Sequence, residues 1–570
     1  MKTKSLILIA LFTGGIFCKY NAVHGQEDKI LVSQNGYGTG LNKVAMVRTP
    51  ADSFSIMNLD HQVIFKGKLQ GPGYWPYSGD WVQTADFSGI RTPGDYYLIL
   101  PGTNEKRRFR INDDPYGDIA NAAVKAFYYN RCSYPILAEY GGVYQRDAGH
   151  PDKIVYVHNS AASAGRPEGT VISSPRGWYD AGDYNKYIVN SGITTYTMLL
   201  AWEFYPVYWK SRKLVIPESG NNVPDLLDET LFNLRWMLTM QDTDGGVYHK
   251  LTTKNFEPFV MPADAHEKRY VIQKSTAASL DFAATMAHAA GVLSGFSAEL
   301  PGLADSCRKA AIAAWEWCRK NPSILYNQPP DISTGAYGDN DIRDEWFWAG
   351  VEMSLLTGTA FPDSSLGKLQ FLTPAWGDVA TLGIITALKN KEKIKPEWYA
   401  KCLNIFYNYA DHLVELADKS AWPVSLDYWK WGSNSDIANQ GLLKMIAFAF
   451  RNDLKYLYSA VNDMNYLTGV NPTGYCFITG FGEKSPRNIH HRVSGSDKII
   501  EPVPGFLAGG PNTVVLNDCP DIKRSLLPAL SYADELCSYS TNEIAINWNA
   551  PLVFLSGAIG YAGTQFQEIK

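Results

Sequence analysis

The chain has 570 residues, of which 45% are apolar and 19% charged, and its net charge is −5. This composition excludes a disordered or highly charged scaffold, and it offers no basic field to attract nucleic acid or anionic lipid. The length exceeds one ordinary hydrophobic core, so we expect two domains, one of them large. Aromatic residues reach 13%. Flat rings with a polar edge suit stacking on sugars, although most of them are expected in the core.

The N-terminus places Lys2 and Lys4 before an apolar run that extends from Leu6 to Phe17. A charged start followed by a short apolar run is typical of a secretory signal peptide and is too short to span a bilayer. We predict a signal peptide over residues 1–25 and a secreted or periplasmic protein. The alternative is an outer-membrane lipoprotein attached through Cys18, which bulky Phe17 disfavours.

Seven cysteines remain after removal of this leader, and they follow no repeated spacing. Cys307 and Cys318 lie on one helical face but about 16 Å apart along the axis, which is too far for a bridge. We therefore expect buried free thiols without a disulfide framework. No His/Cys cluster has the spacing of a zinc site.

Residues 28–113 contain short alternating segments separated by turns. Gly71-Pro72-Gly73 and Thr92-Pro93-Gly94 are typical turn sequences. Regular short strands with such punctuation predict a small all-β sandwich. The predicted strands cover 43–47, 53–59, 63–66, 81–87, 95–100 and 107–111.

The hydrophobic period changes to about 3.6 after residue 115 and stays helical over 115–566. Runs such as Ala277–Gly291 and Gly377–Leu388 are apolar almost all round, as in the inner ring of a closed helical barrel. About twelve helices are predicted, the last two over 527–537 and 543–562. Long loops between them, such as 471–523, are where function is expected.

The loop before the helix predicted from residue 186 carries two carboxylates, Asp180 and Asp183, separated by Ala181-Gly182. The small spacer lets the backbone turn tightly, so that both side chains could face one water. Helix capping is the alternative explanation. Capping does not account for the flanking aromatic residues or for Lys186.

Glu543 is expected at the head of the last helix, beside the apolar run Ile544–Trp548. Apolar surroundings raise the pKa of a carboxyl, which suits a general acid, whereas a hydrogen-bonded loop aspartate stays ionised as a base. The alternative is a charge that merely stabilises the helix N-terminus.

Adjacent His490 and His491 stand between Arg487 and Arg492. Neighbouring positive charge opposes a metal ion, so hydrogen bonds to sugar hydroxyls are the better interpretation. A structural histidine is the alternative for either residue alone.

These stretches resemble glycoside hydrolase family 9. Asp180-Ala-Gly-Asp183 matches the base loop of this family residue for residue. The region from Tyr532 to Ala550 fits its C-terminal signature, and Gly482–Arg492 fits its histidine signature, except that Cys476 replaces the usual Ser, Thr or Val. Similar stretches in family order cover nearly all of 115–565 and include 244–249, 274–284, 344–349, 431–434 and 504–512.

The resemblance implies a mainly α fold, an (α/α)6 barrel preceded by an immunoglobulin-like sandwich, and an inverting mechanism with carboxyl groups roughly 6.5 to 9.5 Å apart. Asp183 would be the base, Asp180 would help to orient the water, and Glu543 would be the acid. The other residues implied are His490, Arg492 and Tyr539 at the sugar, Asp534 as local support of the acid, and His249 and Trp348 as subsite contacts.

The function implied is endo-acting hydrolysis of a β-1,4-glucan such as cellulose, mixed-linkage glucan or xyloglucan. The alternatives are an exo-acting β-glucosidase or glucosaminidase of the same family and a non-catalytic glycan-binding protein. The expected partner is a glucan polysaccharide or oligosaccharide, without nucleic acid or a membrane span, and we expect a monomer. No cofactor is expected. Members of the family often bind structural calcium, and the carboxylates here, including Asp344, form no contiguous calcium loop, so the metal is left open.

Overall fold

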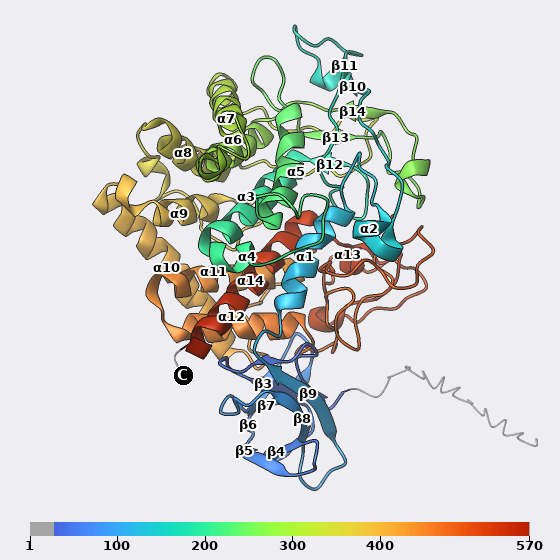
Figure 1. Ribbon diagram of the computed structural model, residues 1–570, viewed down its shortest axis with the longest axis vertical. Helices are drawn as coiled ribbons and strands as arrows, with labels where there is room; N and C mark the ends of the chain where they lie inside the picture. The colour runs from blue at the N-terminus through green and yellow to red at the C-terminus, as the bar shows by residue number, and fades with distance from the viewer. Residues whose placement is uncertain (1–27, 569–570) are drawn as a thin grey trace, which may run out of the picture.

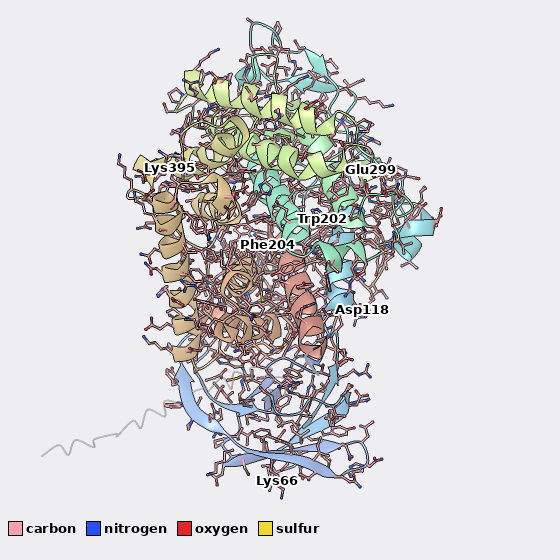
Figure 2. All side chains as sticks on the ribbon, turned by 60° about the vertical axis from the view of Figure 1, so that its left-hand side comes forward. Lys66, Asp118, Trp202, Phe204, Glu299 and Lys395 are labelled. Carbon is pink, nitrogen blue, oxygen red and sulfur yellow. A yellow bond between two sulfur atoms is a disulfide. The ribbon has the colours of Figure 1, made fainter. Side chains whose placement is uncertain are left out.

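The computed structural model describes residues 28–568 of the chain. Nine strands come first, between Ile30 and Asn112, and long helices follow from Gly117. Figure 1 shows the strands as a small body beneath the large helical one. In Figure 2 the sandwich again lies below the barrel, with Lys66 at the far end of the sandwich and Lys395 just before the long helix α10 (Pro396–Lys419). The predicted signal peptide and Cys18 lie outside the described residues.

The strand-rich part is a sandwich of two sheets, in the orders β1-β3-β7-β6 and β2-β9-β8-β4-β5. Alternate residues of both sheets meet between them, and Val47, Ile56, Ala85 and Leu98 are fully buried there. The strands are β1 (Ile30–Leu31), β2 (Tyr37–Gly38), β3 (Val44–Val47), β4 (Ser53–Asn58), β5 (Val63–Lys68), β6 (Gln70–Trp75), β7 (Asp80–Asp86), β8 (Gly94–Ile99) and β9 (Lys106–Asn112).

Strand β6 is missing from the sequence prediction, because Gly71-Pro72-Gly73 reads as a turn. In the structure the register of β6 against β7 shifts between Gln70 and Gly73, so these residues form a bulge within a strand. Gly71 has a φ of +102°, which glycine adopts at little steric cost. The sequence Gly71-Pro72-Gly73 therefore suits a bulge within a strand as well as a turn between strands.

The helical part places long helices in two rings. The inner helices α3, α6, α8, α9, α11 and α14 are buried over nearly their whole length. Outer helices contact them in the pairs α1–α14, α3–α5, α6–α7, α10–α11 and α11–α12. The predicted (α/α)6 barrel is therefore confirmed, although residues 358–379, where an outer helix would be expected, contain only the 3-10 helix Asp363–Ser365.

The long helices are α1 (Gly117–Tyr129), α3 (Ile188–Phe204), α5 (Asp225–Thr239), α6 (Thr276–Leu293), α7 (Leu303–Lys320), α8 (Arg343–Thr357), α9 (Ala380–Lys389), α10 (Pro396–Lys419), α11 (Ser433–Arg451), α12 (Leu454–Leu467) and α14 (Ile546–Glu568). Short helices are α2 (Ala138–Gly141), α4 (Pro206–Lys210) and α13 (Tyr539–Asn542). Among residues 28–568, no helix combines the length and apolarity needed to cross a membrane.

A third small sheet lies within the helical part, in the order β11-β10-β14-β13-β12. Its strands are β10 (Val155–Val157), β11 (Val171–Ile172), β12 (Lys186–Tyr187), β13 (Lys250–Thr252) and β14 (Arg269–Val271). Strand β12 begins three residues after Asp183 and pairs with β13. The sheet therefore fixes the end of the loop that carries the predicted base.

Two predictions about the C-terminal region are wrong. The expected helix over 527–537 is a loop that contains only the 3-10 helix Pro528–Leu530. Cys537 in this loop forms a disulfide with Cys519, whereas free thiols were expected throughout. The disulfide and the hydrogen bonds of Asp534 hold this loop in a non-helical conformation. Cys307 and Cys318 are free and buried, as predicted.

The sandwich and the barrel share an aromatic interface. Trp75 from β6 is 3% exposed, and its ring lies 6.0 Å from Trp422 and 5.3 Å from Trp429 of the barrel. Tyr77 packs on Trp429 at 4.4 Å. These rings belong to the same apolar cluster as the barrel core. The two domains are therefore joined by a continuous packed core.

We expect Trp75→Ala to lower the free energy of unfolding by about 3–5 kcal/mol, because it leaves a large cavity between the two domains. Thermal and chemical unfolding would measure this. Trp81→Ala, in the next strand, is the matched control, since Trp81 is 63% exposed and should change stability by less than about 0.5 kcal/mol. Equal losses in the two variants would contradict an interface held by Trp75.

Candidate active site

A cleft of about 780 Å³ opens among the loops of the barrel. It holds both predicted catalytic carboxylates, together with apolar and aromatic side chains from distant segments. Most of its wall is formed by Ala181, Asp183, Tyr187, Phe256, Gly335–Tyr337, Trp376, Tyr428, Lys430, Trp431, His490, Arg492, Tyr539, Glu543 and Trp548. Aromatic walls with a few polar groups are typical of a ligand site.

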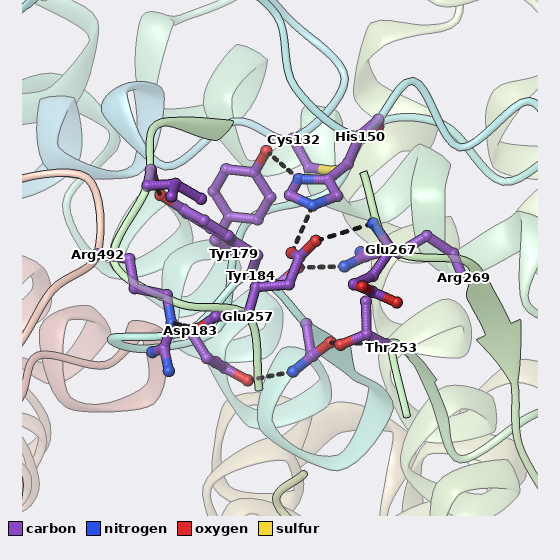
Figure 3. A network of polar contacts seen from close by, with 12 residues as sticks. Cys132, His150, Tyr179, Asp183, Tyr184, Thr253, Glu257, Glu267, Arg269 and Arg492 are labelled. Atoms are coloured by element: carbon purple, nitrogen blue, oxygen red, sulfur yellow. Dashed lines mark hydrogen bonds and ion pairs between the residues drawn. The ribbon is translucent and has the colours of Figure 1, made fainter. Parts of the chain in front are cut away.

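Asp183 lies on the cleft wall and is 5% exposed. Its Oδ2 accepts hydrogen bonds from Asn185 Nδ2 at 2.6 Å and from Tyr187 OH at 3.0 Å. Thr253 N–H donates to Asn185 Oδ1, which fixes the orientation of that amide (Figure 3). Within residues 28–568 no donor bonds Asp183 Oδ1, so this oxygen can accept a proton from water.

Glu543 lies in an extended stretch between α13 and α14, three residues before the last helix, and not at its head as predicted. Residues His490 and Glu543 pair as a parallel bridge. Burial raises the pKa of the Glu543 carboxyl well above its usual range, and the nearby Asp183 charge raises it further, while Gly182 N–H opposes the shift. A carboxyl of this kind keeps its proton near neutral pH, as a general acid requires.

Gly182 connects the base loop to the acid. Its N–H donates to Glu543 Oε1 at 3.3 Å. Its carbonyl accepts from Arg492 N–H at 3.0 Å and from Arg492 Nη1 at 2.8 Å. A Cβ atom added at this glycine would lie 2.3 Å from the His490 carbonyl oxygen. Only glycine therefore fits without moving one of the two segments.

His490 and Arg492 both line the cleft. His490 Nδ1 lies 2.7 Å from the Leu536 carbonyl oxygen, so Nδ1 carries the proton and Nε2 is an acceptor. Burial lowers the pKa of His490, which keeps the ring neutral. Arg492 Nε donates to the Glu257 carbonyl at 2.6 Å. Arg492 therefore supports the base loop in addition to facing the predicted sugar site.

Asp180 is fully buried and is not part of the cleft wall. Its carboxyl accepts from Asn190 Nδ2 at 2.9 Å and from Tyr337 OH at 3.1 Å. Burial, with the charge of Asp183 as a second cause, raises its pKa well above the usual range. In this geometry Asp180 joins the base loop to the cleft residue Tyr337, and its part in orienting the water stays a prediction.

Asp534 accepts hydrogen bonds from the N–H groups of Arg487 and Asn488 and from Asn542 Nδ2, at 2.9 to 3.0 Å. It thus links the segment before His490 to the residue before Glu543. Tyr539 lines the cleft, with its ring 5.4 Å from that of Trp431 and 5.9 Å from that of His490.

The predicted subsite contacts His249 and Trp348 are wrong, because both side chains are fully buried and neither lines the cleft. His249 bonds Ser275 Oγ and the Ala336 carbonyl, each at 2.9 Å. Trp348 lies on inner helix α8, and its ring packs against Tyr196 in the barrel core. Both residues lie in stretches that resemble the family, but such a resemblance does not indicate the direction in which a side chain points.

Sequence reasoning missed Lys250, a fully buried cation beside the cleft. Its Nζ donates to the Gly335 carbonyl at 2.7 Å and to Thr334 Oγ1 at 3.1 Å, and no carboxylate among the described residues forms an ion pair with it. It lies 5.7 Å from the ring of Tyr187, whose hydroxyl bonds Asp183. Burial lowers the pKa of Lys250 to about 7, and Asp183 opposes this shift.

Asp344, the residue considered for calcium, accepts a hydrogen bond from Val379 N–H at 2.8 Å. In the part of the chain that the structure describes, no group of three or more His, Cys, Asp or Glu side chains is arranged to hold a metal ion. Whether the chain binds calcium therefore stays open, and the chemistry below uses side chains alone.

We expect Gly182→Ala to reduce kcat by about 100-fold or more, because the added methyl group displaces the base loop or the His490–Glu543 strand. Steady-state kinetics and circular dichroism would measure activity and fold. Gly220→Ala is the matched control, since a Cβ there meets nothing within 4 Å. Wild-type kcat in Gly182→Ala would show that the two segments need not approach so closely.

We expect Lys250→Met to move the acidic limb of the kcat/KM profile to higher pH, by on the order of one pH unit. Below about pH 7 Lys250 carries its charge, and its removal leaves the carboxyl groups of Asp183, Asp180 and Glu543 without this cation. Lys254→Met, at a half-exposed position, is the control. A variant that only melts at lower temperature, with an unshifted limb, would assign Lys250 a purely structural role.

Comparison with known proteins agrees with this geometry. Residues 116–556 match the Glycosyl hydrolase family 9 profile, and residues 25–105 match the Cellulase N-terminal ig-like domain. A xyloglucan-specific endo-beta-1,4-glucanase of Bacteroides ovatus, BoGH9A, is 41% identical over 94% of each chain. Endoglucanase D of Acetivibrio thermocellus is 31% identical over 95% of this chain and 84% of its own.

Solved structures give the same result. The Bacteroides ovatus GH9 structure superposes with a TM-score of 0.87 at 39% identity, over 94% of this chain and 99% of the other. AaCel9A in complex with cellobiose-like isofagomine gives a TM-score of 0.85 at 30% identity, over 94% and 100% of the two chains. The chain belongs to glycosyl hydrolase family 9, and it is a glycosidase with an N-terminal immunoglobulin-like domain.

Proposed function

We propose that the chain is an inverting endo-β-1,4-glucanase whose substrate is xyloglucan, with Asp183 as the general base and Glu543 as the general acid. The observation that carries this proposal is the pair of carboxyl groups on one cleft, joined through Gly182. The pKa of Glu543 is raised by burial, whereas the described residues hydrogen-bond Asp183 through one oxygen only. Acid and base are thus differentiated by their surroundings.

In the proposed reaction, Glu543 gives its proton to the departing glycosidic oxygen while Asp183 Oδ1 takes a proton from a water molecule. The water oxygen bonds to the anomeric carbon as the bond to the leaving oxygen breaks. The catalytic cycle is complete when Glu543 takes up a proton from solvent and Asp183 releases its proton to solvent. Room for this water requires the separation of roughly 6.5 to 9.5 Å that inverting enzymes share, which stays a prediction here.

An extended cleft supports internal cleavage. A second hollow of about 470 Å³ shares Trp376, Lys430, Trp431, Asn547 and Trp548 with the main cleft, so the two form one continuous groove. Such a groove can hold sugars on both sides of the cleaved bond. The exo-acting alternative would need a wall that closes one end. A non-catalytic role is disfavoured, because both catalytic carboxyl groups face the cleft.

The choice of xyloglucan rests on the Bacteroides ovatus relative, which is named for that specificity. Secretion or a periplasmic location is part of the same proposal. The Cys519–Cys537 disulfide fits an oxidising compartment, and a β-glucan polymer is met outside the cytoplasm.

We expect Asp183→Ala and Glu543→Ala each to lower turnover of xyloglucan by about 100-fold or more, because each removes one proton transfer. Glu397→Ala, an exposed glutamate on α10, is the control. Hydrolysis by Glu543→Ala at the wild-type rate would remove the assignment of the acid.

We also expect the wild-type chain to reduce the viscosity of xyloglucan before much reducing sugar appears, and to act more slowly on carboxymethylcellulose and mixed-linkage glucan. Release of reducing ends without a fall in viscosity would favour the exo-acting alternative. Equal or higher rates on the unbranched glucans would overturn the choice of xyloglucan.

A further inference from the structure

The β-sandwich carries a pair of exposed aromatic rings that its own fold does not use. Tyr74 in β6 and Trp81 in β7 are direct partners in the antiparallel register. Their ring centroids lie 5.3 Å apart, and the residues are 50% and 63% exposed. The next residue in β6, Trp75, is 3% exposed and packs against the barrel. The strand therefore buries one aromatic ring and leaves its neighbour in water.

Leaving two large rings side by side in water forgoes a hydrophobic gain of a few kcal/mol, so an exposed aromatic pair is a common mark of a binding surface. The adjoining charge is neutralised, since Asp80 beside Trp81 pairs with Arg48 at 2.9 Å. An uncharged ligand with flat apolar faces and hydroxyl edges fits this surface better than nucleic acid or an anionic lipid would. A chain of pyranose sugars has those properties.

Strand β6 packs against the barrel segment that also reaches the cleft. Tyr428 and Trp431 line the cleft, and Tyr428 is 69% exposed. Between them in sequence, Trp429 is buried against Trp75 and Tyr77. Trp75 is the residue directly after Tyr74, and Tyr77 comes two positions later. The exposed pair and the cleft thus belong to segments that pack on each other through buried aromatic rings.

We propose that Tyr74 and Trp81 form a second, non-catalytic glycan site that binds the β-1,4-glucan backbone of a polymer whose other sugars occupy the cleft. The identity of the glycan rests on the proposed function. The site would act by holding the polymer near the enzyme, so it matters for long substrates and not for short ones. The sandwich would then contribute to binding in addition to covering one side of the barrel.

Affinity electrophoresis through gels that contain xyloglucan tests this proposal, with the full-length Glu543→Gln chain as the non-hydrolysing parent. We expect Tyr74→Ala/Trp81→Ala in that background to weaken retardation about fivefold, which corresponds to the loss of stacking by aromatic rings. Tyr458→Ala, which removes a 39% exposed tyrosine on α12, is the matched control and should migrate as the parent does.

In the otherwise wild-type chain, the Tyr74→Ala/Trp81→Ala double variant should keep its rate on a short xyloglucan oligosaccharide and lose rate on dilute polymer. Unchanged retardation of the double variant would overturn the proposal. A dimer in sedimentation experiments that this double variant abolishes would instead assign the pair to self-association and would also overturn it. Failure of the proposed function looks different, because the wild-type chain would then hydrolyse no β-glucan while the gel still reports binding.

Discussion

The peptide groups on either side of Gly182 hold the two halves of the catalytic apparatus together. One peptide N–H reaches Glu543, and the following carbonyl accepts two hydrogen bonds from Arg492. The base comes from residue 183 and the acid from residue 543, so this contact joins segments that are 360 positions apart in sequence. Backbone groups cannot change rotamer, and they therefore fix the geometry more firmly than long side chains would.

Three carboxyl groups, Asp180, Asp183 and Glu543, are concentrated in this poorly solvated region, which is electrostatically costly. The three carboxyl groups differ in the hydrogen-bond donors around them. Among residues 28–568, Tyr187 and Asn185 donate to Asp183, and Tyr337 and Asn190 donate to Asp180. Within the same range the side chain of Glu543 receives a single long hydrogen bond. Lys250 and Arg492 add positive charge nearby. The unequal supply of donors is what allows similar side chains to act as acid and base.

The sequence predicted the parts of this site that are local and missed those that depend on tertiary contacts. Asp183 and Glu543 were identifiable because the spacing of Asp180 and Asp183 and the apolar run after Glu543 are local signals that also follow a family pattern. The direction of a side chain is not local, so His249 and Trp348 were placed at the sugar although both are buried. Lys250 gave no signal, and the Cys519–Cys537 bridge depends on a loop course that periodicity cannot predict.

The central claim is that water is activated by Asp183 on the side of the sugar opposite to Glu543. The most direct measurement is proton NMR of the reducing ends during the first minutes of hydrolysis of a β-1,4-glucan oligosaccharide, before mutarotation. Inversion predicts that the α-anomer accumulates first and that the β-anomer follows by mutarotation. Initial release of the β-anomer would mean retention of configuration, and it would contradict the assignment of Asp183 as a base acting on water.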